Sequence, residues 1–185
     1  MHRPFRNPHR NRSNPPARVH SFPGRFMGVN HLVMRFLWDI YHQKRNEKMI
    51  YIGIDPGTHT GIAVWSHEQR KFVCVETKTI CEAMDDILSL GDQYGIDNIL
   101  VKFEDARLRK WFGTAGREQL QGAGSIKRDC QIWQEFLSSK SIPFAAVAPK
   151  ANRTKMRAER FKMYTGWISR TSEHARDAAM LVFGL

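Results

Sequence analysis

Residues 51–65 read YIGIDPGTHTGIAVW, two apolar runs separated by a short polar turn. Isoleucine and valine alternate with small residues in both runs, which is typical of strands, and Pro56 and Gly57 favour a turn between them. A third run, KFVCVET at 71–77, follows the polar stretch SHEQR. The three runs predict an antiparallel meander. Asp55 is the one acid in the opening stretch, and it stands where the first strand ends.

The rest of the sequence continues in an α/β order. Apolar residues at helical spacing occupy 80–95 and roughly 123–139, and a last helix is predicted over 173–185. Apolar runs at 97–105 and 142–148 predict two further strands. Parallel strands added to an antiparallel hairpin give a five-stranded mixed sheet flanked by helices, so the expected fold class is α/β.

The first 48 residues form a basic arm. They hold eight Arg and two Lys against Asp39 and Glu47, which is a net charge of +8 out of +11 for the whole chain. Prolines and arginines with few aliphatic residues predict a largely disordered segment, and apolar spacing predicts a short helix at 30–46. Three interpretations of the arm remain open: an electrostatic clamp on phosphates, a solvated tail, or an extension upstream of a translation start at Met49. Residues 49–185 are expected to form the functional domain.

The composition narrows the class of protein. The three cysteines show no CxxC spacing, so they indicate neither a disulfide framework nor a cysteine zinc site. No apolar run approaches the roughly 20 residues of a membrane span, and we expect no membrane partner. The net charge of +11 favours a polyanionic partner.

Two acids stand at the ends of predicted strands. Asp55 follows the first strand, where it either caps the turn or contributes to a site outside the strand ends. Glu104 ends the fourth strand, and alternation places Lys102 and Glu104 on one face of it and Phe103 and Asp105 on the other. We expect the more polar face to line the site, so Glu104 is the first candidate on this strand and Asp105 the second.

The predicted last helix carries two more candidates. His174 and Asp177 are three residues apart and therefore share a helix face, behind an N-cap at Thr171 or Ser172. Glu173 either joins them or favours the helix N-terminus electrostatically. Carboxylates with an imidazole suit hard divalent cations, and two Mg²⁺ ions can promote phosphodiester hydrolysis.

Together, IGIDPGTHTGIA, the strand-end acid in VKFED and the final HARDAAML resemble the RuvC family of Holliday-junction resolvases, in the RNase H-like superfamily. The resemblance covers Met49 to Leu185, and the central region is closer to phage-type members. It implies an RNase H-like fold, a homodimer, and cleavage of four-way or other branched DNA with two Mg²⁺ ions, for which Mn²⁺ can substitute. The metal ligands it implies are Asp55, Glu104, His174 and Asp177. We accordingly expect a cytoplasmic protein of bacterial or phage origin.

Two basic segments are candidates for DNA contacts. The loop after Glu104 offers cations for phosphates and aromatic rings for stacking on unpaired bases; its candidates are Arg107, Arg109, Lys110, Trp111 and Phe112. The resemblance implies that one of the aromatic rings wedges into the junction. The segment after the last strand includes Arg153, and the resemblance assigns support of the scissile phosphate to Lys150 or Lys155.

Three alternatives remain open at the level of sequence. The opening stretch is also similar to YqgF-like nucleases of the same fold, which act on RNA. A second alternative is a DNA-binding module without catalysis, against which the four candidate ligands argue. A third is the sugar-kinase and actin group of ATPases, which needs two related lobes, whereas this chain has one such motif.

Overall fold

The computed structural model describes residues 35–36, 39–40, 48–108, 117–149 and 156–185, with the backbone alone described for 117–123. The chain divides into two units, Met1–Leu37 and Trp38–Leu185, and the sheet with its helices belongs to the second. Residues 35–36 and 39–40 have helical backbone. The rest of the predicted basic arm, with the rest of the helix predicted at 30–46, lies outside the described residues.

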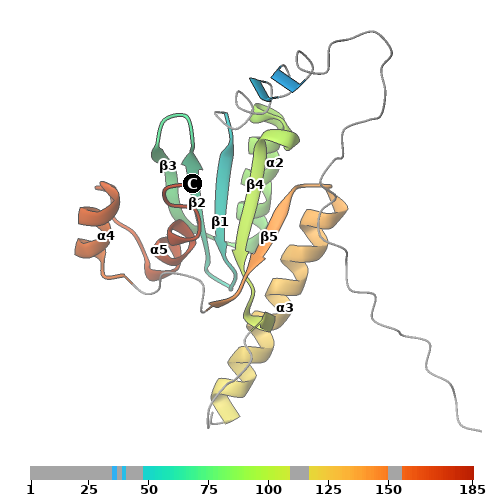
Figure 1. Ribbon diagram of the computed structural model, residues 1–185. Helices are drawn as coiled ribbons and strands as arrows, with labels where there is room; N and C mark the ends of the chain where they lie inside the picture. Colours follow the sequence, from blue (N-terminus) through green and yellow to red (C-terminus); the bar gives the residue numbers. More distant parts are fainter. Residues whose placement is uncertain (1–34, 37–38, 41–47, 109–116, 150–155) are drawn as a thin grey trace, which may run out of the picture. The chain divides into compact units, whose positions relative to one another are not determined.

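Five strands form one mixed sheet in the order β3-β2-β1-β4-β5 (Figure 1). β1, β2 and β3 are antiparallel, and β4 and β5 are parallel to β1. The strands span Ile50–Asp55 (β1), Thr60–Ser66 (β2), Lys71–Lys78 (β3), Ile99–Glu104 (β4) and Phe144–Val147 (β5). The predicted fold class, an RNase H-like five-stranded mixed sheet, is therefore confirmed.

The helices mostly agree with the sequence pattern. They span Ile80–Tyr94 (α2), Arg117–Ser139 (α3), Ala158–Thr165 (α4) and Glu173–Met180 (α5), with single 3₁₀ turns at Ile96–Asn98 (η1) and Ala106–Leu108 (η2). α3 begins earlier than predicted, and α5 ends at Met180, before a series of turns. α4 was not predicted. None of the described helices is long and apolar enough to cross a bilayer.

Helices cover both faces of the sheet. α2 and α3 pack on one face, where Trp133 and Leu137 of α3 meet Ile52 and Ile54 of β1. α5 packs on the other face across β1, β2 and β3, together with the buried Phe161 of α4 (Figure 1). Because side chains of a strand alternate between faces, odd-numbered residues of β1 point toward the α5 side. This alternation decides which acids can meet.

Candidate active site

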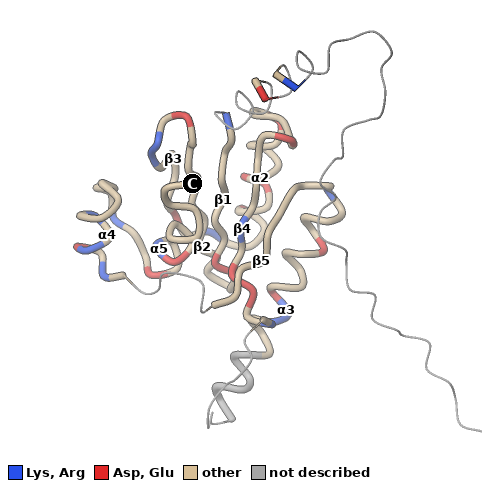
Figure 2. The backbone as a smooth tube through the Cα atoms, in the orientation of Figure 1, with Lys and Arg blue, Asp and Glu red and all other residues tan. Residues whose placement is uncertain are grey.

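The ends of β1 and β4 bring two acids together. The two strands are parallel neighbours with Ile54 opposite Phe103, so that the next residues, Asp55 and Glu104, are adjacent at the same edge of the sheet. Ile54 and Phe103 are fully buried in the core under α2 and α3. Asp55 and Glu104 therefore point to the α5 side, and acidic positions gather at this edge (Figure 2).

α5 reaches this edge because two strand residues have no side chain. A Cβ on Gly53 of β1 would lie 2.0 Å from the carbonyl oxygen of Ala178, and one on Gly61 of β2 would lie 2.0 Å from that of His174. The facing residues of α5 are small as well, since Ala175 and Ala178 are fully buried. Gly53 and Gly61 thus both leave room for the last helix to approach the sheet.

The first turn of α5 places His174 on Asp55. Ser172 is the N-cap of the helix, as predicted, and its Oγ accepts a hydrogen bond from the Ala175 amide at 3.0 Å. His174 Nδ1 then lies 2.8 Å from Asp55 Oδ2. The Asp55 side chain is 17% exposed and that of His174 50%, so the imidazole lies between the carboxylate and solvent. The pairing joins residues 119 apart in the sequence.

Asp55 lies in a place that is unfavourable for a negative charge. Burial raises its pKa to about 6, the hydrogen bond and charge of His174 oppose this rise, and the charges of Glu104 and Asp177 add to it. Glu104 and Asp177 thus lie within electrostatic reach of Asp55. The four residues predicted as ligands meet at one edge of the sheet, and their three carboxylates would be stabilised there by a cation.

The donor chemistry of these four residues fits Mg²⁺, which prefers oxygen ligands and retains several waters. Their positions as they stand do not form a ligand cage. Within the part of the chain that the structure describes, no three His, Cys, Asp or Glu side chains are spaced to hold an ion. The carboxylate of Asp55 instead forms a hydrogen bond with His174.

Asp105 has a different role from its neighbour Glu104. It is buried on the opposite side, where its two oxygens accept hydrogen bonds from Nε and Nη2 of Arg107, both at 2.8 Å. Nη2 also donates to Gln134 of α3. Burial tends to raise the pKa of Asp105, but the hydrogen bonds and charge of Arg107 outweigh it and lower the pKa. Asp105, the second choice for the site acid on β4, thus ties the end of β4 to α3 through Arg107, whose predicted contact with DNA stays a prediction.

Replacing Arg107 by Ala is expected to destabilise the fold by about 2–3 kcal/mol, because Asp105 would remain as a buried, unpaired charge. The side chain of Arg107 is 29% exposed, so water limits the loss. The pKa of Asp105 is lowered in the folded state, so this stabilisation is present above its unfolded pKa and disappears as the pH falls. Urea unfolding at neutral and acidic pH measures it. Wild-type stability at neutral pH would contradict the assignment, and Asp105→Asn/Arg107→Ala should recover part of the loss.

The structure describes some of the other residues predicted from the sequence and leaves out the rest. Glu173 is described, is exposed and lies in the first turn of α5. The remaining candidates lie outside the described residues: Arg109, Lys110, Trp111, Phe112, Lys150, Arg153 and Lys155. Their predicted roles stay predictions.

Lys102 was overlooked as a site residue. It lies on the same face of β4 as Glu104, two residues earlier, and is paired in register with Gly53. Its side chain is half-buried there. A lysine at this place can meet a phosphate brought to the acids, and the alternation along 97–105 was the signal that placed it.

No protein-family model matches the chain, and no curated protein sequence matches it. Among solved structures, T. thermophilus RuvC in complex with a Holliday junction substrate is similar with a TM-score of 0.41 and 16% identity. The match covers 72% of this chain and 90% of the RuvC chain. The fold assignment itself rests on the order and direction of the five strands.

Proposed function

We propose that this protein is a metal-dependent endonuclease that hydrolyses phosphodiester bonds in branched DNA, four-way junctions above all. The observation that carries the proposal is the pairing of Asp55 with His174 at the strand edge, within electrostatic reach of Glu104 and Asp177. These four residues, in this order along the chain, carry the resemblance of the sequence to the RuvC family. They stand here on an RNase H-like sheet.

The candidate site supports hydrolysis by holding acids and a base where a phosphate can approach. Asp55, Glu104, Asp177 and His174 would hold Mg²⁺, which supplies charge for the phosphate oxygens and acidity for a water. When the Nδ1–H of neutral His174 donates a hydrogen bond to Asp55, the lone pair of Nε2 is left as an acceptor. Because the imidazole is half exposed, Nε2 can take part from the solvent side.

The DNA contacts we propose come from three parts of the chain. Lys102 on the sheet face would meet the scissile phosphate, with support from Lys150 or Lys155. Arg109, Lys110 and Arg153 would contact neighbouring phosphates, while Trp111 or Phe112 would stack at the branch point. A homodimer would present two such sites to symmetrically related strands.

The test is cleavage of a panel of labelled substrates: four-way junction, fork, linear duplex and RNA–DNA hybrid, each with and without Mg²⁺. We expect paired nicks near the crossover of the four-way junction that require Mg²⁺ or Mn²⁺. Glu104→Gln, purified identically, controls for a contaminating nuclease and should be inactive. Preferred cleavage of the hybrid would favour an RNA-directed enzyme, and no cleavage of any substrate would reject the proposal.

A further inference from the structure

A hollow lined by apolar and charged residues lies outside the candidate site. It has a volume of about 300 Å³ and is formed by α4 and the segment that joins α4 to α5. Its lining includes the cations Lys162 and Arg170 and the hydroxyls of Ser169 and Thr171. Glu159 also lines it, so the charges among its lining residues are two positive and one negative. None of these residues takes part in the site described above.

Trp167 lines the hollow as well. The ring itself is held in place from the other side, because it packs edge-on against Phe72 of β3 at a centroid distance of 6.3 Å. Two cations and two hydroxyls that line one hollow are suited to an anion with several oxygens, such as a phosphate group.

Arg176 of α5 fixes this hollow to the helix that carries the candidate site. Its Nε donates to the carbonyl of Met156, just before α4, at 2.7 Å. Its Nη1 donates to the carbonyl of Thr171, just before α5, at 2.8 Å. One guanidinium therefore binds the backbone on both sides of α4, just before α4 and just before α5. Because Arg176 stands between His174 and Asp177 in the sequence, the hollow and the acids are attached to the same short helix.

We propose that this hollow binds a backbone phosphate of the DNA strand that flanks the cleavage site. The inference rests on the proposed function, since it assumes a DNA substrate, and adds a contact surface outside the metal-binding residues. Lys and Arg are distributed along α4 (Figure 2), and the whole chain carries a net charge of +11. Met163 and Ile168, which are 80% and 79% exposed beside the hollow, offer apolar surface to a protein partner instead, but the cations favour a polyanion.

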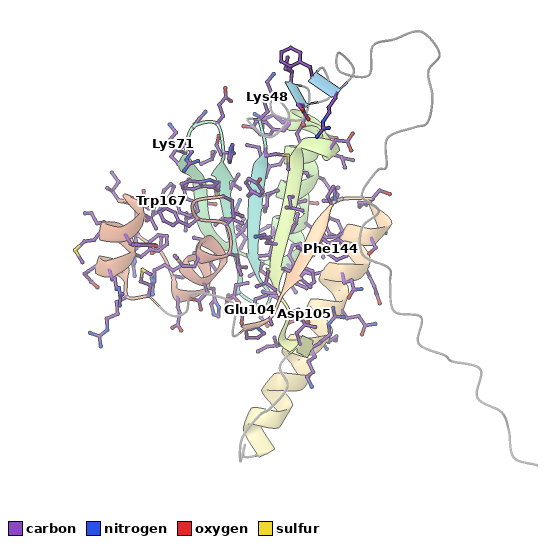
Figure 3. The ribbon with its side chains drawn as sticks, viewed as in Figure 1. Lys48, Lys71, Glu104, Asp105, Phe144 and Trp167 are labelled. Atoms are coloured by element: carbon purple, nitrogen blue, oxygen red, sulfur yellow. The ribbon has the colours of Figure 1, made fainter. Side chains whose placement is uncertain are left out.

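The experiment compares two double variants with the same change in net charge. Lys162→Gln/Arg170→Gln removes the two cations of the hollow. Lys71→Gln/Lys140→Gln removes two exposed lysines that do not line the hollow; Lys71, at the start of β3, is labelled in Figure 3. Binding of a labelled four-way junction and a labelled duplex is measured by fluorescence anisotropy in EDTA over a range of salt concentrations, so that cleavage is not needed.

We expect the hollow variant to bind about 10-fold more weakly at moderate salt and its log–log salt slope to fall by about 1, because one phosphate contact is lost and each such contact contributes about 0.9. The control variant should stay close to wild type in both quantities. Equal losses in the two variants would show a general charge effect and overturn the proposal. An unchanged affinity in the hollow variant would overturn it as well and would point to a protein partner for Met163 and Ile168.

Failure of this inference can be told apart from failure of the proposed function. If the protein cleaves junctions but the hollow variant binds like wild type, only the phosphate site is wrong. If no DNA is bound or cleaved by the wild-type protein, the proposed function is wrong. Thermal unfolding of both double variants confirms that they are folded, as expected for exposed side chains.

Discussion

Asp55→Asn is expected to reduce Mg²⁺-dependent cleavage by about a thousand-fold or more, and at the same time to stabilise the ion-free protein at alkaline pH. Cleavage is lost because the Asp55 carboxylate bonds to His174 and lies within electrostatic reach of Glu104 and Asp177. Stability is gained because the same carboxylate is buried, and its negative charge there lowers the free energy of unfolding. An amide keeps the shape of the side chain and can still hydrogen-bond to His174.

The pH dependence gives the sign of the stability effect. The pKa of Asp55 is raised from 3.8 to about 6 in the folded protein. Folding is therefore favoured most below the unfolded pKa, and this contribution is lost as the pH rises through about 6. A shift of this size corresponds to about 3 kcal/mol, of which Asp55→Asn should recover about 2–3 kcal/mol above pH 7 and almost nothing below pH 4.

The measurement is urea unfolding in EDTA across this pH range, followed by addition of Mg²⁺. We expect Mg²⁺ to stabilise the wild-type protein and not Asp55→Asn, because only a folded site with its acids binds the ion. Asp92→Asn, at an exposed position of α2, is the matched control and should change neither stability nor cleavage. Full cleavage by Asp55→Asn, or a loss of stability at alkaline pH, would refute the role assigned to Asp55.

Gly53→Ala and Gly61→Ala are each expected to cost about 3–5 kcal/mol of folding free energy, because the added methyl meets backbone rather than a movable side chain. In both cases the new Cβ would lie 2.0 Å from a carbonyl oxygen of α5. The helix can only move away from the sheet, which carries His174 away from Asp55. Cleavage should fall with stability, even at temperatures where the variants remain folded.

Gly124→Ala is the matched control, because a Cβ at that position of α3 has no heavy atom within 4 Å. Alanine there is expected to leave stability unchanged or raise it by about 0.5–1 kcal/mol, as for any exposed glycine in a helix. Chemical unfolding of the three variants under one condition gives the comparison. Equal stability of Gly53→Ala and Gly124→Ala would rule out the close approach of α5 as the reason for the glycine.

Much of the fold could be predicted because its signals are local. The alternation in β1, β2 and β4 and the helical spacing in α2 each lie within one element, and turn residues separate them. α4 was missed because it is short, its apolar residues alternate with Arg160 and Lys162, and only Phe161 is buried. No local pattern distinguishes such a short helix from a charged loop; contact with Phe72, on another element, makes the difference.

The candidate site shows the same division. Residue type and order along the chain were enough to select Asp55, Glu104, His174 and Asp177, and strand alternation favoured Glu104 over Asp105. The contact of Arg107 with Asp105 and with Gln134 of α3 depends on packing between segments, which spacing in the sequence cannot reveal. Hydrogen bonds and buried charges depend on distances of a few ångströms between segments far apart in the chain. Periodicity determines which way a side chain points, and only packing determines what it meets.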